Sequence, residues 1–221
     1  VSRSWNSALY AMQQVIEYVS SAYLPVGQVE QADARQSYLP DSSANVWFTD
    51  PPYYFAVPYA DLSDFFYVWL KRSLGNQVPL RKSSHLQNGL TPKDQELCEM
   101  AHWDSVRYPH KDKAFFESGM GEAFSEGNRV LKDGGIGCVV FAHKTTEGWE
   151  ALLAGLIQGN WVITGSWPIA TEAGNRLRAH DSAALATSVH LVCRVRPDTA
   201  SVGDWSTVFR ELPNYVGKWM T

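Results

Sequence analysis

The stretch Ala44-Asn-Val-Trp-Phe-Thr-Asp-Pro-Pro-Tyr53 joins a short apolar run to a double-proline turn. The run from residue 44 to 48 predicts a strand compact enough to be buried in a parallel sheet. Two successive prolines fix φ at about −65° and supply no backbone N–H, so the turn is rigid and its carbonyls point outward as acceptors. Ligands of open α/β sheets bind outside the carboxyl ends of the strands. The sequence therefore predicts a site at Asp50-Pro51-Pro52-Tyr53.

Apolar spacing predicts further elements on both sides of this turn. A spacing of three and four residues predicts helices over 7–22, 61–72 (with Asp61 or Ser63 as its cap), 111–131 and 147–158. Apolar runs predict strands over 26–32, 137–142, 161–167 and 188–195, the last antiparallel to its predecessor. Gly134-Gly135 fits a C-cap that ends the third helix. Strands and helices that alternate with short connections are typical of a doubly wound α/β sheet.

Composition limits the class of protein. The chain has 221 residues, of which 45% are hydrophobic and 19% charged, so a single domain over 1–221 is expected. No apolar run approaches the roughly 18 residues of a membrane span, and the start does not resemble a signal peptide, so we expect a cytoplasmic protein. The three cysteines, Cys98, Cys138 and Cys193, are too far apart for a zinc or redox motif, so we expect reduced thiols and no metal.

Basic residues concentrate in one polar segment. The formal net charge of −4 argues against a surface that binds polyanions everywhere. Between positions 71 and 93, however, no acidic residue occurs and five basic ones do: Lys71, Arg72, Arg81, Lys82 and Lys93. Residues 73–110 therefore read as an inserted basic loop that contacts phosphates, or alternatively as a solvated connection.

The Asp50 turn has the chemistry needed to hold an exocyclic amine. The Asp50 carboxylate and the Pro51 carbonyl form an acceptor pair that can bind both N–H groups of such an amine and direct its lone pair at a methyl donor. A base inside a duplex cannot reach the turn, so it must be flipped out and held on an aromatic face. Tyr53 is the first candidate for that face. Further candidates for the pocket wall are Tyr54, Phe55 and Tyr59.

His143 and Lys144 follow the strand predicted over 137–142, so they are expected at the same sheet edge as Asp50. They are candidates for lining the pocket or contacting phosphate, or else polar residues that open a loop. Trp149 is expected to pack in the core rather than to bind a base. A later polar loop holds other residues that either approach DNA or lie in a solvated hairpin, namely Arg176, Arg178 and His180.

Three segments closely resemble one protein family. The first is Thr49-Asp-Pro-Pro-Tyr-Tyr-Phe-Ala-Val-Pro-Tyr-Ala-Asp-Leu-Ser-Asp-Phe-Phe-Tyr-Val-Trp-Leu-Lys-Arg72, and the others are Arg129-Val-Leu-Lys-Asp-Gly-Gly135 and Phe141-Ala-His-Lys-Thr-Thr-Glu-Gly-Trp149. They resemble the large adenine-specific DNA methylases associated with domain of unknown function 1156. The resemblance runs from about residue 29 to residue 196. It implies a Rossmann-like methyltransferase fold, a mostly parallel sheet with a C-terminal antiparallel strand, S-adenosylmethionine as cofactor, and DNA as partner.

The resemblance also assigns a cofactor side. An acidic residue after an early strand contacts the cofactor's adenine in such enzymes, and Asp33, followed by Ala34, matches that position; Asp50 borders the same cofactor. The alternative for Asp33 is a turn or capping residue. No Phe-x-Gly-x-Gly turn of the family is found. We therefore expect the catalytic portion of a longer polypeptide, with the first strands of the sheet missing and the glycine-rich loop in the upstream part.

The functional prediction is transfer of a methyl group to adenine N6 of DNA, in modification, restriction or defence. The same turn also serves cytosine N4, an RNA base or a protein glutamine. A different class of function remains possible for the sequence, that of a binding domain that positions DNA without catalysis. The intact turn argues against that class, and the missing glycine loop argues for it.

Overall fold

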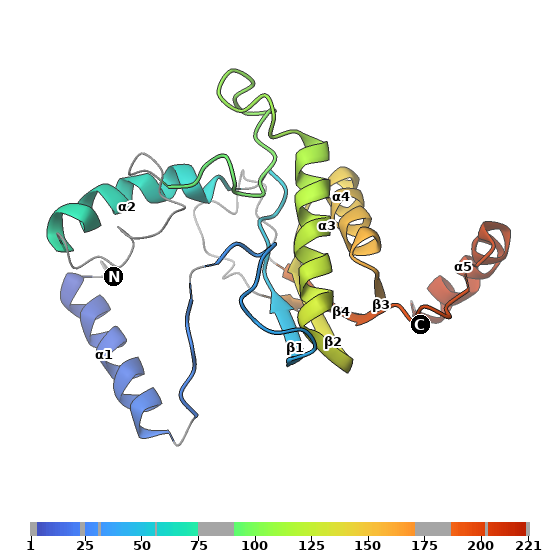
Figure 1. Cartoon of the computed structure of the whole chain (residues 1–221), viewed down its shortest axis with the longest axis horizontal. Coiled ribbons are helices and arrows are strands. Elements are labelled where there is room, and N and C mark those ends of the chain that lie inside the picture. The colour runs from blue at the N-terminus through green and yellow to red at the C-terminus, as the bar shows by residue number, and fades with distance from the viewer. Residues whose placement is uncertain are drawn as a thin grey trace. The chain divides into compact units, whose positions relative to one another are not determined.

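The computed structural model describes residues 4–22, 25–30, 32–55, 57–74, 91–170, 187–201 and 203–219 (Figure 1). The chain divides into two compact units, Val1–Ala32 and Asp33–Thr221. The first contains helix α1, Trp5–Ser21, whose N-cap Ser4 accepts the Ser7 N–H at 3.2 Å. The strand predicted over 26–32 is wrong for the residues described there, because no ladder partner binds them and Val26 and Val29 are 97% and 101% exposed. The prediction of a single domain stays a prediction.

The second unit is an α/β structure built on a mixed four-stranded sheet. Its elements are β1 (Ala44–Thr49), α2 (Tyr59–Leu74), α3 (Lys113–Val130), β2 (Leu131–Phe141), α4 (Thr146–Gln158), β3 (Trp161–Ala170), β4 (Thr187–Val195) and α5 (Trp205–Trp219). The strand order is β1-β2-β4-β3, with β1 parallel to β2 and β4 antiparallel to both neighbours. Three strands therefore share one direction and the last strand is antiparallel, as predicted, although only one hydrogen-bonded pair is parallel.

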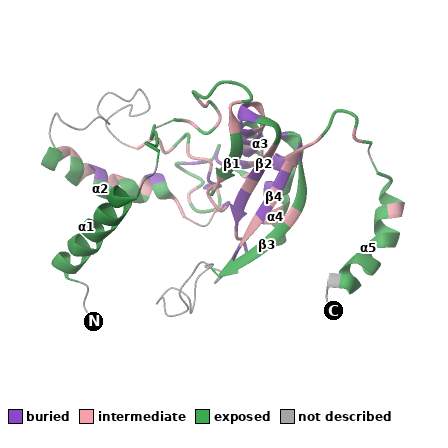
Figure 2. Cartoon of the chain, turned by 90° about the horizontal axis from the view of Figure 1, so that it is seen from below, coloured by how far each residue is buried: buried purple, intermediate pink, exposed green. Residues whose placement is uncertain are grey.

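One face of the sheet carries the core. Side chains from α3, α4 and the strands join in a single buried cluster, shown in purple on these elements in Figure 2. Packed against this cluster, the Trp47 ring stacks on Trp161 at 5.4 Å and meets the edge of Phe124 at 5.8 Å. A Cβ at Gly127 would come within 2.4 Å of the Trp47 ring, so glycine is what lets α3 lie directly on this strand.

β1 is the outermost strand of the described sheet, and the prediction that it is buried is only half right. Trp47 points into the core, whereas Val46 and Phe48 are each 60% exposed on the opposite face. Alternate residues of a strand point to opposite faces, and in this unit α3 and α4 cover the face that Trp47 reaches. The apolar run predicted the strand correctly but not which faces are covered.

The connection from α3 to β2 differs from the prediction. The helix ends at Val130 with Leu131 as its C-cap, so Gly134-Gly135 is not the cap. Both glycines lie within β2, where Gly134 has a φ of 74°. The register against β1 passes from Ala44↔Leu131 to Val46↔Ile136. β2 therefore has an irregularity here, which the positive φ of Gly134 permits.

Helix starts follow ordinary capping rules. Asp112 accepts the Phe115 N–H at 2.9 Å and Thr145 accepts the Gly148 N–H at 3.3 Å, which begin α3 and α4. α2 begins at Tyr59, two residues before Asp61, so neither predicted cap residue stands at its start. None of the helices in the described ranges has the length and apolar character needed to cross a membrane.

Candidate functional site

The Asp50 turn leaves the sheet beside the residues that follow β2. Thr49, the last residue of β1, pairs with Val139 of the parallel strand β2. β2 ends at Phe141, so His143 and Lys144 come out at the same edge as Asp50, as predicted. Both strand-to-helix connections of this edge therefore contribute to one site, the first leading from β1 toward α2 and the second from β2 into α4.

The two predicted acceptors are open. The Asp50 side chain is exposed and, among the described residues, has no hydrogen-bond or ion-pair partner, and the same part of the chain supplies no donor to the Pro51 carbonyl. Pro51 and Pro52 are half-buried, which fixes the turn on the domain. The Pro52 carbonyl differs, because it accepts the Tyr54 N–H at 3.0 Å. An incoming donor thus meets two acceptors that no described group already occupies.

The Tyr54 side chain supports the turn from within the core, so it does not line the pocket wall as predicted. Its side chain is 2% exposed and its backbone is left-handed, with a φ of 54°. The ring meets Phe116 edge-on at 5.1 Å, and the hydroxyl donates to Glu147 of α4 at 3.0 Å. Burial and then this hydrogen bond raise the pKa of Tyr54, so the phenol stays protonated. A bulky residue in a strained conformation is held here by contacts on every side.

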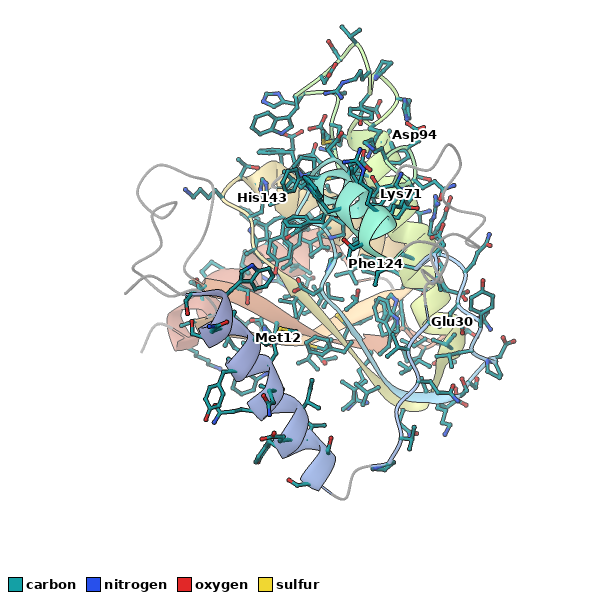
Figure 3. All side chains as sticks on the ribbon, turned by 90° about the vertical axis from the view of Figure 1, so that its left-hand side faces the viewer. Met12, Glu30, Lys71, Asp94, Phe124 and His143 are labelled. Carbon is teal, nitrogen blue, oxygen red and sulfur yellow. The ribbon has the colours of Figure 1, made fainter. Side chains whose placement is uncertain are left out.

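Rings gather beside the turn. Tyr53 is half-buried and meets Phe141 edge-on at 5.4 Å, and Phe55 meets His143 edge-on at 4.9 Å. His143 is 7% exposed and lies among these side chains (Figure 3). Its Nδ1 accepts the Thr145 N–H at 3.2 Å, so a neutral His143 carries its proton on Nε2. Trp149 packs against Phe141 and the core, as predicted.

Two of the basic candidates, Lys71 and Arg72, are not brought to the turn. Lys71 and Arg72 lie in the last turn of α2, over the rings of Tyr67 and Trp69 at 4.5 and 5.7 Å. Tyr59 begins that helix and is 57% exposed. A helix rises about 1.5 Å per residue, so Lys71 lies about 18 Å from Tyr59 along the helix axis. Lys144 is exposed beside His143. The other predicted contacts, Arg81, Lys82, Arg176, Arg178 and His180, lie outside the described residues.

Asp33 lies elsewhere. Its carboxylate accepts the backbone N–H of Arg35 at 2.9 Å and pairs with the guanidinium at 2.7 Å, the pattern of a turn aspartate, and Ala34 is exposed in that turn. The pair borders a hollow of about 580 Å³ along the second half of α3. This is the end of α3 whose Arg129 carbonyl accepts the Ser42 N–H before β1 begins. Asp33 and Asp50 are therefore at opposite ends of β1, and the hollow is not part of the turn.

Residues 91–112 form a clamp on the turn that the sequence did not predict. Backbone groups after the prolines receive three bonds from this clamp: Glu99 N–H to the Tyr54 carbonyl at 3.1 Å, Cys98 Sγ to the same carbonyl at 3.0 Å, and Trp103 Nε1 to the Phe55 carbonyl at 3.2 Å. Cys98 is completely buried, and burial raises the pKa of its thiol to about 12. The apolar positions within 98–108 were the available signal, because Cys98, Met100 and Tyr108 form a buried cluster of their own.

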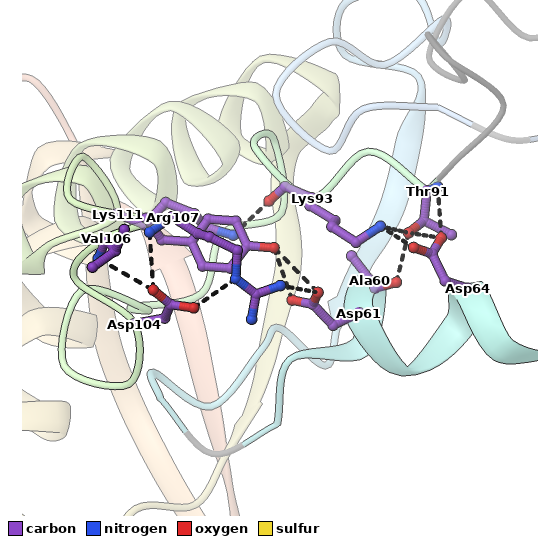
Figure 4. Close-up of polar contacts among 10 residues, drawn as sticks. Ala60, Asp61, Asp64, Thr91, Lys93, Asp104, Val106, Arg107 and Lys111 are labelled. Atoms are coloured by element: carbon purple, nitrogen blue, oxygen red, sulfur yellow. Dashed lines mark hydrogen bonds and ion pairs between the residues drawn. The ribbon is translucent and has the colours of Figure 1, made fainter.

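Charged side chains fix the clamp on α2 (Figure 4). Lys111 is 1% exposed, its Nζ donates to the Lys93 carbonyl at 2.6 Å, and burial lowers its pKa against the opposing effect of Glu96. Lys93 itself pairs with Asp64 of α2. Burial raises the pKa of Asp64, but hydrogen bonds from Lys93 and Thr91 outweigh it and hold the value at about 2. Buried charges remain stable only when paired in this way.

The clamp contains part of the predicted basic loop, so the structure bears on one of the predicted phosphate contacts. Lys93 is engaged with Asp64, so for this residue the structural contact replaces a phosphate contact.

Within the described ranges no group of His, Cys, Asp or Glu is arranged to hold a metal ion. The sequence matches no protein-family model and no curated protein, so the resemblance to adenine-specific DNA methylases stays a prediction.

Proposed function

We propose that this chain binds a flipped-out DNA base and presents its exocyclic amine for methylation, with adenine N6 as the target and S-adenosylmethionine as the methyl donor. The observation that carries the proposal is the pair of open acceptors, the Asp50 carboxylate and the Pro51 carbonyl, on a rigid turn at the carboxyl edge of β1. Two successive prolines supply no backbone N–H, so the turn has no donor of its own there and both acceptors can receive an incoming amine.

The acceptor pair fits the chemistry of a poor nucleophile. The lone pair of an aromatic amine is delocalised into the ring, and two hydrogen bonds to its N–H groups favour a pyramidal nitrogen with a localised lone pair. Positive charge grows on that nitrogen as it bonds to carbon, and a carboxylate stabilises this charge more than it stabilises the neutral amine. Asp50 is also the first acceptor in reach of the proton that the methylated nitrogen loses. S-adenosylmethionine would supply an electrophilic methyl group.

The rings beside the turn supply the surface that a flipped base needs. Tyr53 and Phe55 follow the prolines and are both half-buried, so each has a supported side and an accessible one. Stacking of a base on an aromatic side chain contributes about 1–3 kcal/mol. The buried His143 ring meets Phe55 edge-on and supports it beside the turn.

The described residues fit the target side of such a reaction and not the whole cofactor. Neither connection at this edge, residues 50–58 or 142–145, contains a glycine, so neither forms the glycine-rich loop that cradles a cofactor at a strand-to-helix turn. Asp33 is paired with Arg35 far from the turn. We therefore do not assign the methionine end of the cofactor to either connection, and we derive no step from its binding here.

A second candidate function is a domain that holds DNA without transferring a methyl group. The missing glycine loop favours it. Within the first candidate, cytosine N4, an RNA base and a protein glutamine all carry a planar amine that the same acceptors can bind. The rings favour a base over glutamine, because an amide side chain gains little from stacking.

The test is methyl transfer in the protein expressed from its whole reading frame. Asp50→Ala should reduce transfer from tritiated S-adenosylmethionine to DNA by at least about a hundredfold, because it removes one charged group aimed at the transition state. DNA binding should be nearly unchanged. The matched control is Asp133→Ala, an exposed aspartate at the opposite end of the sheet. More than about a tenth of the wild-type rate in Asp50→Ala would refute the assignment.

A further inference from the structure

Trp103 is an exposed ring that the fold holds in a set direction. It lies in the clamp and is 65% exposed, and its indole N–H donates to the Phe55 carbonyl at 3.2 Å. The other exposed tryptophans that the structure describes, Trp5, Trp69, Trp167 and Trp205, have no such bond to a described group. The indole N–H of Trp103 is therefore satisfied within the protein while the apolar ring stays exposed, a combination that suits an interface.

Aromatic contacts connect Trp103 to the Asp50 turn without a break. They run from Trp103 to His102 at 6.3 Å, to Phe55 at 5.8 Å, to His143 at 4.9 Å, to Phe141 at 6.2 Å and to Tyr53 at 5.4 Å. We call these six rings the aromatic row. Its inner members, Phe141 and His143, are buried, and its outer members, His102 and Trp103, are exposed. The row therefore extends from the predicted base pocket to the surface.

The carboxylates next to the outer rings are already bonded. Glu99 is buried and accepts the His102 N–H at 2.9 Å, and Asp104 accepts from Arg107 at 2.6 Å. Hydrogen bonds from Arg107 lower the pKa of Asp104, so this carboxylate is charged but neutralised by its partner. Arg107 itself is 67% exposed at the side chain. The surroundings of Trp103 thus present little unpaired negative charge to a nucleic acid backbone.

We propose that the Trp103 ring is a stacking platform for an unpaired nucleobase of single-stranded DNA, with His102 edge-on beside it, next to the base held at the Asp50 turn. This inference rests on the proposed function and names a second contact of the same substrate. Flipping one base leaves its neighbours without their stacking partner, and aromatic side chains in protein grooves take up such bases with little regard to sequence. The clamp carries the platform, so the segment that fixes the turn also extends the binding surface.

The experiment measures binding of a fluorescein-labelled single-stranded DNA of about 12 nucleotides by fluorescence anisotropy, with the 221-residue chain and no cofactor. Trp103→Ala should weaken binding about tenfold, the loss expected for one stacked base, and Trp103→Phe should remain within about threefold of wild type because it keeps a ring. Trp205→Ala is the matched control, since Trp205 is 72% exposed on α5 and has no part in the row. Its affinity should equal that of wild type.

Equal affinities of Trp103→Ala and wild type would overturn the platform, and so would a wild-type chain that does not bind the oligonucleotide. The two proposals are separable. Trp103-dependent binding, together with no methyl transfer by the protein expressed from the whole reading frame, supports the platform and refutes the proposed function. Methyl transfer whose KM for DNA is unaffected by Trp103→Ala refutes the platform and leaves the proposed function standing.

Discussion

Replacing Tyr54 by phenylalanine removes a single hydroxyl from the support of the Asp50 turn. The ring is 2% exposed, and the hydroxyl donates to Glu147 at 3.0 Å. A hydrogen bond to a charged group contributes about 1.5–3 kcal/mol net. Glu147 is exposed, so water replaces the lost donor at its carboxylate and the cost falls at the lower end of that range. We expect Tyr54→Phe to lower the free energy of unfolding by about 1.5 kcal/mol.

Urea denaturation followed by tryptophan fluorescence at pH 7 measures this loss. Tyr38→Phe is the matched control, because Tyr38 is 69% exposed and its hydroxyl has no hydrogen-bond partner among the described residues. A second arm repeats Tyr54→Phe in a Glu147→Gln background, where the bond lacks its charge and the cost should drop to about 1 kcal/mol or less. If Tyr54→Phe is as harmless as Tyr38→Phe, the turn is not held in the way described.

Two further predictions concern acid stability and the cofactor. The pKa of Asp64 is held at about 2 in the folded chain, below its usual value, so its ion pair with Lys93 contributes stability above about pH 4 that is lost as the pH falls through about 2. With solvent screening, the free energy of unfolding lost on acidification is about 1 kcal/mol. Asp64→Asn should remove that part of the pH dependence in urea titrations between about pH 2 and 5. A variant whose pH profile equals that of wild type would contradict this prediction. Calorimetric titration of the chain with S-adenosylmethionine should show weak or no binding, and a low micromolar Kd would show that a cofactor loop has been missed.

Much of the fold could be predicted because the spacing of apolar residues and the turn residues beside them determine helices and strands locally. The apolar runs that became β1, β2, β3 and β4 are bounded by turn residues, and the helix spacing of α3 and α4 is regular. The Asp50 turn was predictable for the same reason, since two prolines restrict the backbone whatever lies around them. Its position at the same edge as His143 followed from the parallel direction of two consecutive strands, between which α2 and α3 lie in the chain.

What the sequence could not predict depends on distant partners. Residues 26–30 have the apolar content of a strand but no ladder to join. Tyr54 reads as a surface aromatic of a proline turn, and only the carbonyl and hydroxyl contacts from Glu99 and Glu147 show that it supports the turn from the core. In the clamp, only the apolar positions Cys98, Met100 and Tyr108 carry a sequence signal, because buried single charges such as Lys111 have no periodicity.

In the proposed function, the Asp50 carboxylate binds the exocyclic amine of a flipped base. The direct test compares two duplexes, one with an unpaired adenine and one with an unpaired purine that lacks the N6 amine, for binding to the wild-type chain and to Asp50→Ala. Loss of a hydrogen bond to a carboxylate costs about 1.5–3 kcal/mol, so removing the amine should weaken wild-type binding by about tenfold or more. The same change should have almost no effect on Asp50→Ala, which gives a coupling free energy of at least about 1.5 kcal/mol. An equal loss in both proteins, or none in the wild type, would contradict the claim.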